Sequence, residues 1–176
     1  MYRNPDQIKG PVPKRQYPVP LIAQEKEYGC WAASMAMILS WKHQKMFTPA
    51  QVAQKVGYEK MREQGLHPED TKAFKDWGFT WLYPQSFMVA GFAELIRQHG
   101  PIWVATAVPT PHVRVVTGFE AHPDPARALV YINDPGPVHK GSVYIETYET
   151  FSTKKNTLAS KELLGDFPDA LYTAYL

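Results

Sequence analysis

Residues 29–41, GCWAASMAMILSW, decide the fold of this chain. From Ala32 onward the stretch is apolar on nearly every side of a helix, and a helix of that kind is stable when it is buried. Gly29 can make the tight turn that leads into the helix. The stretch therefore predicts a buried helix that starts at or near Cys30, the single cysteine of the chain.

Three more helices are indicated after this one. Residues 48–57, TPAQVAQKVG, combine a threonine N-cap, a proline at the first helical position and a glycine stop. Residues 67–78 carry acidic side chains in the first turn, where the helix dipole favours them, and end at a glycine. Residues 91–99 form the fourth expected helix, which a Gly-Pro pair closes.

The second half of the chain has the pattern of β-strands. Four short segments are rich in Val, Ile and Tyr and are separated by Pro, Asp, Gly and Asn, which favour turns. These segments are residues 102–108, 113–119, 128–132 and 142–148. Helices followed by strands indicate an α+β fold.

The length of 176 residues predicts one domain with a sizeable core. We expect an extended, proline-rich N-terminal arm over 1–16, a core over 17–152 and a C-terminal tail over 153–176, polar at first and weakly helical around 161–164. The arm has no hydrophobic signal core, so the sequence does not encode ordinary secretory export.

Composition excludes some classes of function. The chain has 19 Lys and Arg against 17 Asp and Glu, and no basic block longer than two residues, which gives little electrostatic support for nucleic-acid binding. No apolar run approaches the length of a membrane-spanning helix. One cysteine excludes an internal disulfide framework and a thiolate-rich zinc site, and the histidines show no metal-ligand spacing.

A cysteine at the start of a helix has two interpretations. The N-terminus of a helix favours the thiolate, which is the nucleophilic form of cysteine. A lone cysteine is also often a small buried hydrophobe. Three other groups favour the first interpretation because they supply what thiol catalysis needs: Gln24 could donate to an oxyanion, His112 starts a strand and could act as a base, and Asn133 or Asp134 ends the next strand and could orient the imidazole.

With these residues in this order, the chain resembles the papain-like cysteine proteases. Gln24 and the run 29–32, GCWA, match the cysteine box of that family. The separation of 82 residues between Cys30 and His112 (112 − 30) is similar to the compact bacterial branch, which includes injected effector proteases and bacteriocin leader peptidases. The resemblance spans about residues 17–152 and implies a helical N-terminal part, with a buried catalytic helix, packed on a C-terminal antiparallel sheet.

The resemblance implies a role for each matching residue. Cys30 corresponds to the nucleophile, His112 to the general base and later acid, and Gln24 to the oxyanion donor. An Asp-Pro step usually orients the histidine in the compact branch, which favours Asp134, whereas plant-type enzymes use an asparagine, which would favour Asn133. The two side chains point to opposite faces of an extended strand, so only one of them should reach His112.

Three residues are candidates for substrate contact. Trp31 is expected to belong to the core and also to wall the site beside Cys30, and Asn133 is a candidate if it does not orient the histidine. Arg114 stands where the branch usually has a small or aliphatic residue. It shares a strand face with His112 by alternation, and could contact substrate or be a solvated charge at the sheet edge.

The function implied is that of an endopeptidase which cuts specific proteins through a thioester, with no cofactor. A secreted bacterial effector or interbacterial toxin is the expected role. Such a protein would be made in the bacterial cytoplasm, delivered by a specialised secretion system such as type VI, and restrained by a cognate inhibitor. Two alternatives stay open: a deamidase or transglutaminase-like acyl transferase using the same site, and a non-catalytic binding module on the same fold.

Overall fold

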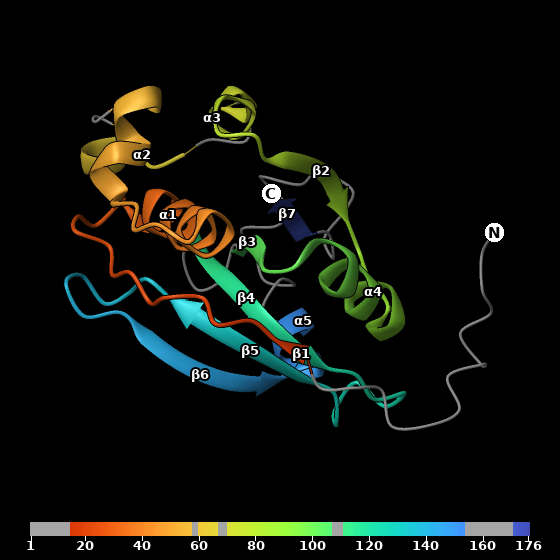
Figure 1. The fold of residues 1–176 in the computed structure, drawn as a ribbon. Coiled ribbons are helices and arrows are strands. Elements are labelled where there is room, and N and C mark those ends of the chain that lie inside the picture. Colours follow the sequence, from red (N-terminus) through yellow and green to blue (C-terminus); the bar gives the residue numbers. More distant parts are fainter. Residues whose placement is uncertain (1–14, 58–59, 67–69, 107–110, 154–170) are drawn as a thin grey trace.

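The computed structural model describes residues 15–57, 60–66, 70–106, 111–153 and 171–176 (Figure 1). Its helices pack on both faces of one antiparallel sheet. The elements in chain order are β1 (Arg15–Gln16), α1 (Cys30–His43), α2 (Pro49–Val56), the π-helical turn η2 (Lys60–Gln64), α3 (Thr71–Asp76), β2 (Thr80–Gln85), α4 (Val89–His99), β3 (Ile102–Thr106), β4 (His112–Glu120), β5 (Leu129–Asp134), β6 (Ser142–Thr147), α5 (Tyr148–Thr153) and β7 (Leu171–Tyr175).

Helix α1 is buried along most of its length, as the sequence predicted. Every residue from Trp31 to Ser40 is buried, so the helix has no solvent-facing stripe until its last turn, where Lys42 and His43 complement the helix dipole. Figure 1 shows α1 lying across β4, with α2 above it. The Ser34 hydroxyl donates to the carbonyl of Val113 on β4 at 3.4 Å, which joins the helix directly to the sheet.

The signals that flank α2 act as the sequence predicted. Thr48 is the N-cap, and its side chain accepts from the backbone N–H of Gln51, whose own side chain accepts from the N–H of Thr48. Pro49 is the first helical residue, and Gly57 follows the last. Local cap chemistry therefore sets both ends of this helix.

The sheet has the strand order β2-β7-β3-β4-β5-β6, and β1 pairs with the end of β4. Every pair is antiparallel. The α+β prediction, with a buried helix packed on an antiparallel sheet, is confirmed. Three details differ from the expectation. Residues 80–85 form a strand before α4, residues 148–153 form helix α5, and the last residues of the expected tail form β7 inside the sheet, with Thr173 and Ala174 buried. The expected weak helix at 161–164 lies outside the described residues.

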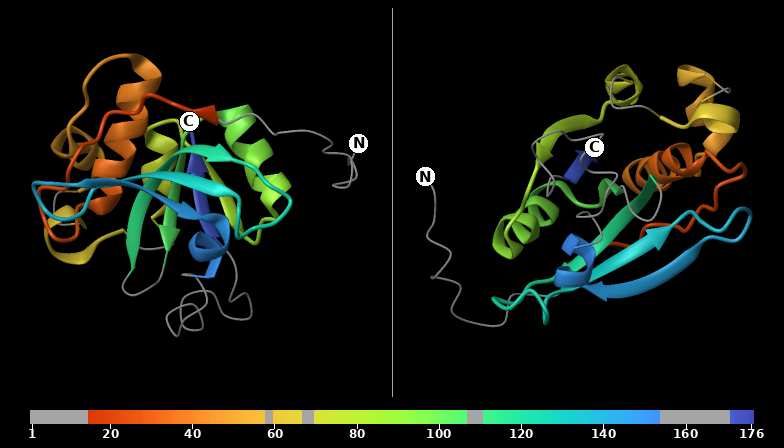
Figure 2. Two further views of the ribbon diagram at one scale, coloured as in Figure 1. Left: turned by 90° about the horizontal axis from the view of Figure 1, so that it is seen from below. Right: turned by 180° about the vertical axis from the view of Figure 1, so that it is seen from behind.

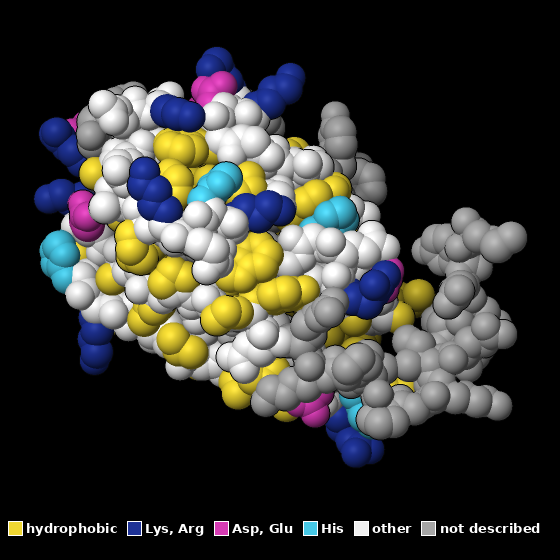
Figure 3. All heavy atoms as spheres, in the orientation of Figure 1, with side chains coloured by type: hydrophobic (Ala, Val, Ile, Leu, Met, Phe, Trp, Pro, Cys, Tyr) yellow, Lys and Arg dark blue, Asp and Glu magenta, His cyan; other side chains and the backbone are white. Residues whose placement is uncertain are grey.

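The two faces of the sheet bury separate hydrophobic clusters, because alternate residues of a strand point to opposite faces. Trp103, Val113 and Val115 pack with α1, whereas Val104 and Val116 face a second cluster with α4 and α5. In the left view of Figure 2, α1 and α4 lie on opposite sides of the strands. In Figure 3, hydrophobic side chains reach the surface among polar and charged ones. No helix among the described residues is long and apolar enough to cross a bilayer.

Gly100, which follows α4, provides a test of the packing between α1 and α4. It has φ 83° and ψ −146°, and a Cβ there would lie 2.6 Å from the Trp41 ring. Gly100→Ala is therefore expected to lower the free energy of unfolding by about 2 kcal/mol, as measured by urea denaturation. Gly91→Ala is the matched control, since a Cβ at that helical position meets nothing within 4 Å and should stabilise slightly. Equal effects at the two positions would contradict the described turn.

Candidate active site

Cys30 is the first residue of α1 and is partly exposed. Gly29 precedes it as the N-cap, and the Gly29 N–H closes a turn onto the carbonyl of Lys26 at 3.0 Å. The N–H of Ala33 donates to the Gly29 carbonyl, so the N–H groups of Cys30, Trp31 and Ala32 come before the first bond of the helix. The thiol therefore lies at the positive end of the helix dipole, as the sequence predicted.

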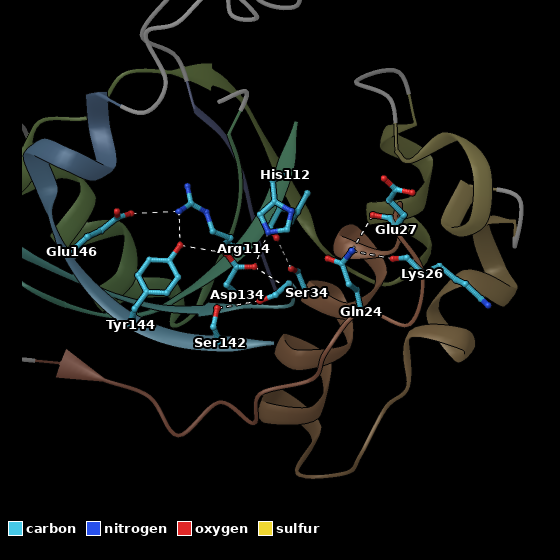
Figure 4. Close-up of polar contacts among 12 residues, drawn as sticks. Gln24, Lys26, Glu27, Ser34, His112, Arg114, Asp134, Ser142, Tyr144 and Glu146 are labelled. Carbon is cyan, nitrogen blue, oxygen red and sulfur yellow. Dashed lines mark hydrogen bonds and ion pairs between the residues drawn. The ribbon is translucent and has the colours of Figure 1, made fainter. Parts of the chain in front are cut away.

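His112 and Asp134 meet at one end of the sheet. His112 is the first residue of β4, Asp134 is the last residue of β5, and these strands are neighbours. His112 Nε2 lies 2.6 Å from Asp134 Oδ1 (Figure 4). Asn133 is directed elsewhere, and its Nδ2 donates to the carbonyl of Val19 at 3.0 Å. Of the two candidates from the sequence, Asp134 is the one that contacts the imidazole.

The three groups are coupled electrostatically. Burial alone would lower the pKa of His112, but hydrogen bonds and charge interactions with Asp134 and Cys30 outweigh burial and raise it from 6.5 to about 9. Burial alone would raise the pKa of Asp134, but its bond to His112, the Gly136 N–H and the charge of Arg114 hold that pKa below its usual value. The imidazolium form therefore contributes stability below pH 6.5, and this contribution is lost as pH rises through about 9.

Hydrogen bonds from both its backbone and its side chain fix the position of Gln24 in the site. Its N–H donates to the carbonyl of Pro135 at 2.9 Å, and its carbonyl accepts from the N–H of His139 at 2.8 Å. The side-chain Nε2 donates to the carbonyls of Lys26 at 3.0 Å and Glu27 at 2.9 Å, as Figure 4 shows.

The Gln24 amide therefore uses both of its N–H groups on the loop before Cys30. Its buried Oε1 has no hydrogen-bond partner among the described residues. This oxygen lies on the side of Gly136, where a Cβ would be 3.6 Å from it and 3.5 Å from His112 Cε1. The expected role of Gln24 as an oxyanion donor stays a prediction, and it requires Nε2 to leave one of the loop carbonyls.

Gln24→Glu tests this orientation of the amide. A carboxylate at this position would put oxygen against the two loop carbonyls, so we expect a loss of about 1–3 kcal/mol in the free energy of unfolding at neutral pH. Gln24→Ala should lose less, because it removes the two bonds without adding repulsion. Chemical denaturation of both variants gives the comparison. A Gln24→Glu chain as stable as the parent would contradict the two described bonds from Nε2 to the loop carbonyls.

The structure places all three expected substrate contacts, Trp31, Arg114 and Asn133, inside the protein, and Asn133 is 5% exposed. Trp31 is 0% exposed. Its Nε1 donates to the carbonyl of Lys60 at 3.3 Å, and its carbonyl accepts from Nε1 of Trp103 at 3.4 Å. Trp31 is therefore a core residue and presents no surface to a substrate. Arg114 is only 5% exposed, so it is neither a solvated edge charge nor accessible to a substrate.

Arg114 belongs to a polar cluster that no pattern in the sequence indicated. Its Nη1 donates to the hydroxyl of Tyr144 at 2.7 Å, and Glu146 Oε1 lies 3.5 Å away. Tyr144 and Glu146 read as ordinary strand residues in the sequence, since their side chains reach Arg114 only after β6 folds back beside β5. The available signal was their alternation with Ser142, which pairs with Asp134.

The described residues contain no group of three or more His, Cys, Asp or Glu that could hold a metal ion. What the site provides is a thiol at a helix N-terminus, a charged imidazole and a carboxylate that holds the imidazole. This combination suits nucleophilic attack on a carbonyl carbon.

The family model described as "Papain-like cysteine protease AvrRpt2" matches residues 13–155, which include every residue of the site. No curated protein matches the chain.

Proposed function

This chain belongs to the AvrRpt2 family of papain-like cysteine proteases, and from that premise we propose that it cleaves specific proteins through Cys30, His112 and Asp134. Protease activity follows from the family. The observation that supports the three residues is the 2.6 Å contact between His112 Nε2 and Asp134 Oδ1, with Cys30 interacting with the same imidazole.

The proposed mechanism begins with a proton on His112 and a thiolate on Cys30. The sulfur attacks the carbonyl carbon of the scissile amide, and the developing oxyanion is stabilised by N–H groups at the start of α1. The imidazolium of His112 gives its proton to the leaving nitrogen, and the amine departs from a thioester on Cys30. His112 then takes a proton from water, the resulting hydroxide attacks the thioester, and the acid product leaves.

Asp134 contributes to every step through His112. Its Oδ1 accepts from Nε2, so the other ring nitrogen, Nδ1, is the one left to exchange a proton with the sulfur, the leaving amine and water. Its negative charge stabilises the imidazolium that the first half of the reaction requires. Asp134 therefore orients the base and helps to keep it charged.

We place this activity in a bacterial effector or toxin. Support comes from the sequence resemblance to the compact bacterial branch and from the family match. In this proposal the chain is made in the bacterial cytoplasm, a specialised secretion system delivers it, and it acts on proteins of the target cell. A producer exposed to its own protease needs a cognate inhibitor, which is the partner that we expect besides the substrate.

The test compares the parent chain with Cys30→Ala in bacterial cells. Growth is recorded, and new protein N-termini in the same cultures are labelled and identified. We expect one or two cleaved proteins and slower growth with the parent chain, and neither with Cys30→Ala. If bacterial cells give no new termini, purified chain is added to eukaryotic lysate. Ammonia release without new termini in either setting would contradict proteolysis and indicate deamidation.

A further inference from the structure

The polar cluster behind Asp134 consists of three side chains from two strands: Arg114 on β4, and Tyr144 and Glu146 on β6. All three lie on the sheet face that His112 and Asp134 share (Figure 4). Arg114 is 5% exposed, and the side chain of Glu146 is 8% exposed. A buried charge pair so close to a catalytic carboxylate could compete with His112 for it, so the arrangement of its bonds matters.

The donors in the cluster determine where the Tyr144 proton points. The guanidinium of Arg114 can only donate, and its Nη1 donates to the Tyr144 oxygen at 2.7 Å. The Tyr144 hydrogen must then go to another acceptor. Asp134 Oδ2 lies 3.4 Å from the hydroxyl, and the bond runs from Tyr144 to this oxygen. At that length the bond is weak, so it helps to orient the carboxylate but does not compete with the shorter contact to His112.

Asp134 is thereby held through both of its oxygens. Oδ1 accepts from His112 and from the Gly136 N–H at 2.8 Å, while Oδ2 accepts from Tyr144. The plane of the carboxylate is fixed as a result. Glu146 lies 3.5 Å from Arg114, and its negative charge partly balances the positive charge of the guanidinium. Arg114 is thus satisfied by Tyr144 and Glu146, and Asp134 stays with His112.

We propose that Tyr144 is a positioning residue of this protease: its hydroxyl, oriented by Arg114, keeps the Asp134 carboxylate turned toward His112 and keeps the guanidinium away from it. The inference rests on the proposed catalytic role of His112 and Asp134. It adds a residue that acts on His112 only through Asp134.

The consequence concerns the proton of His112. The charged or titratable groups around Asp134 are His112 and Arg114 from β4, Tyr144 and Glu146 from β6, and Cys30 from α1 through the imidazole. Without the Tyr144 hydroxyl, Asp134 Oδ2 and Arg114 Nη1 would both lose a partner inside the protein, and a carboxylate and a guanidinium pair readily. An Asp134 turned toward Arg114 would hold the imidazolium less strongly, so the pKa of His112 should fall.

The experiment is an NMR titration of the His112 ring in the full chain, which needs no substrate. The parent should titrate at about pH 9. In Tyr144→Phe, which keeps the aromatic ring, we expect a midpoint about one unit lower, a tenfold loss of proton affinity. The resonance of the proton between Nε2 and Asp134 should shift with it. His112→Ala identifies both signals by removing them.

Tyr131→Phe on β5 is the matched control. Its hydroxyl also donates to a carboxylate, Glu120 Oε2, at 3.3 Å, but it belongs to the other sheet face. This variant should titrate like the parent. A second test combines Arg114→Met and Glu146→Gln with Tyr144→Phe. This triple variant lacks the guanidinium that would compete with His112 for Asp134, so the midpoint of the His112 titration should return toward 9.

A parental midpoint in Tyr144→Phe, or an equal shift in Tyr131→Phe, would overturn the inference. Thermal unfolding of each variant checks that the fold is kept. A shifted midpoint in Tyr144→Phe together with no protein cleavage by the parent would instead refute the proposed function and leave the positioning of Asp134 intact.

Discussion

Asp134→Asn is expected to lower kcat/KM by about 10³–10⁴ while leaving the fold intact. The neutral amide keeps the size of the carboxylate, and its oxygen can still accept from the Gly136 N–H. It carries no charge to stabilise the imidazolium, so the pKa of His112 should fall from about 9 toward its ordinary value. The measurement is cleavage of the protein identified by N-terminal labelling, with parent and variant at the same pH.

Asn133→Ala is the control for this prediction. It removes the bond to the Val19 carbonyl, so it should lower stability while leaving the rate per folded molecule unchanged. Comparing Asp134→Asn with Asn133→Ala thus shows whether an aspartate or an asparagine orients the histidine, the two possibilities that the sequence left open. A large loss of rate in Asn133→Ala, with a small loss in Asp134→Asn, would assign the orienting role to the asparagine.

Trp31→Ala is expected to cost about 3–5 kcal/mol of unfolding free energy, the largest effect on stability among these predictions. The indole is fully buried between η2 and the sheet, and its removal leaves a cavity and takes one of two donors from the Lys60 carbonyl, which keeps its bond from the Gly65 N–H. Trp31→Phe should cost less, because it keeps part of the volume. Chemical denaturation of both variants gives the comparison.

The same variants test whether Trp31 contacts the substrate. A residue that walls the substrate site would change KM when it is replaced. Because Trp31 is enclosed, Trp31→Phe should keep the KM of the parent for the identified substrate. A raised KM with unchanged stability would contradict the described packing.

The parts of the fold that could be predicted are those that local chemistry determines. Helix α2 carries its own start and stop signals, and the burial of α1 follows from a stretch in which Ser34 and Ser40 are the only polar side chains between Cys30 and Lys42. Strands β2 and β7 were missed because neither has such a signal. Residues 80–85 contain a proline, and residues 171–175 contain no Val or Ile, so only their pairing with each other and of 171–175 with β3 defines them as strands.

The features of the site also fall into those that the sequence could predict and those that it could not. Alternation along β5 already implied that only one of Asn133 and Asp134 would reach His112, and a helix starting at Cys30 followed from its apolar stretch. The burial of Arg114 could not be read, since it depends on the register of β6 against β5. The direction of the Gln24 amide was equally unreadable, because carbonyls of the following loop determine it.

The position of β7 in the sheet also determines when the sheet can be completed during synthesis of the chain. Strands β2 and β3 are joined only through β7, which the ribosome makes after every other strand described here. A nascent chain that has reached residue 153 already contains Cys30, His112 and Asp134, yet β2 and β3 still lack their common neighbour. Completion of the sheet therefore requires residues 171–175. A chain truncated before them would contain Cys30, His112 and Asp134 but would leave one edge of β2 and one edge of β3 unpaired, and exposed strand edges promote aggregation.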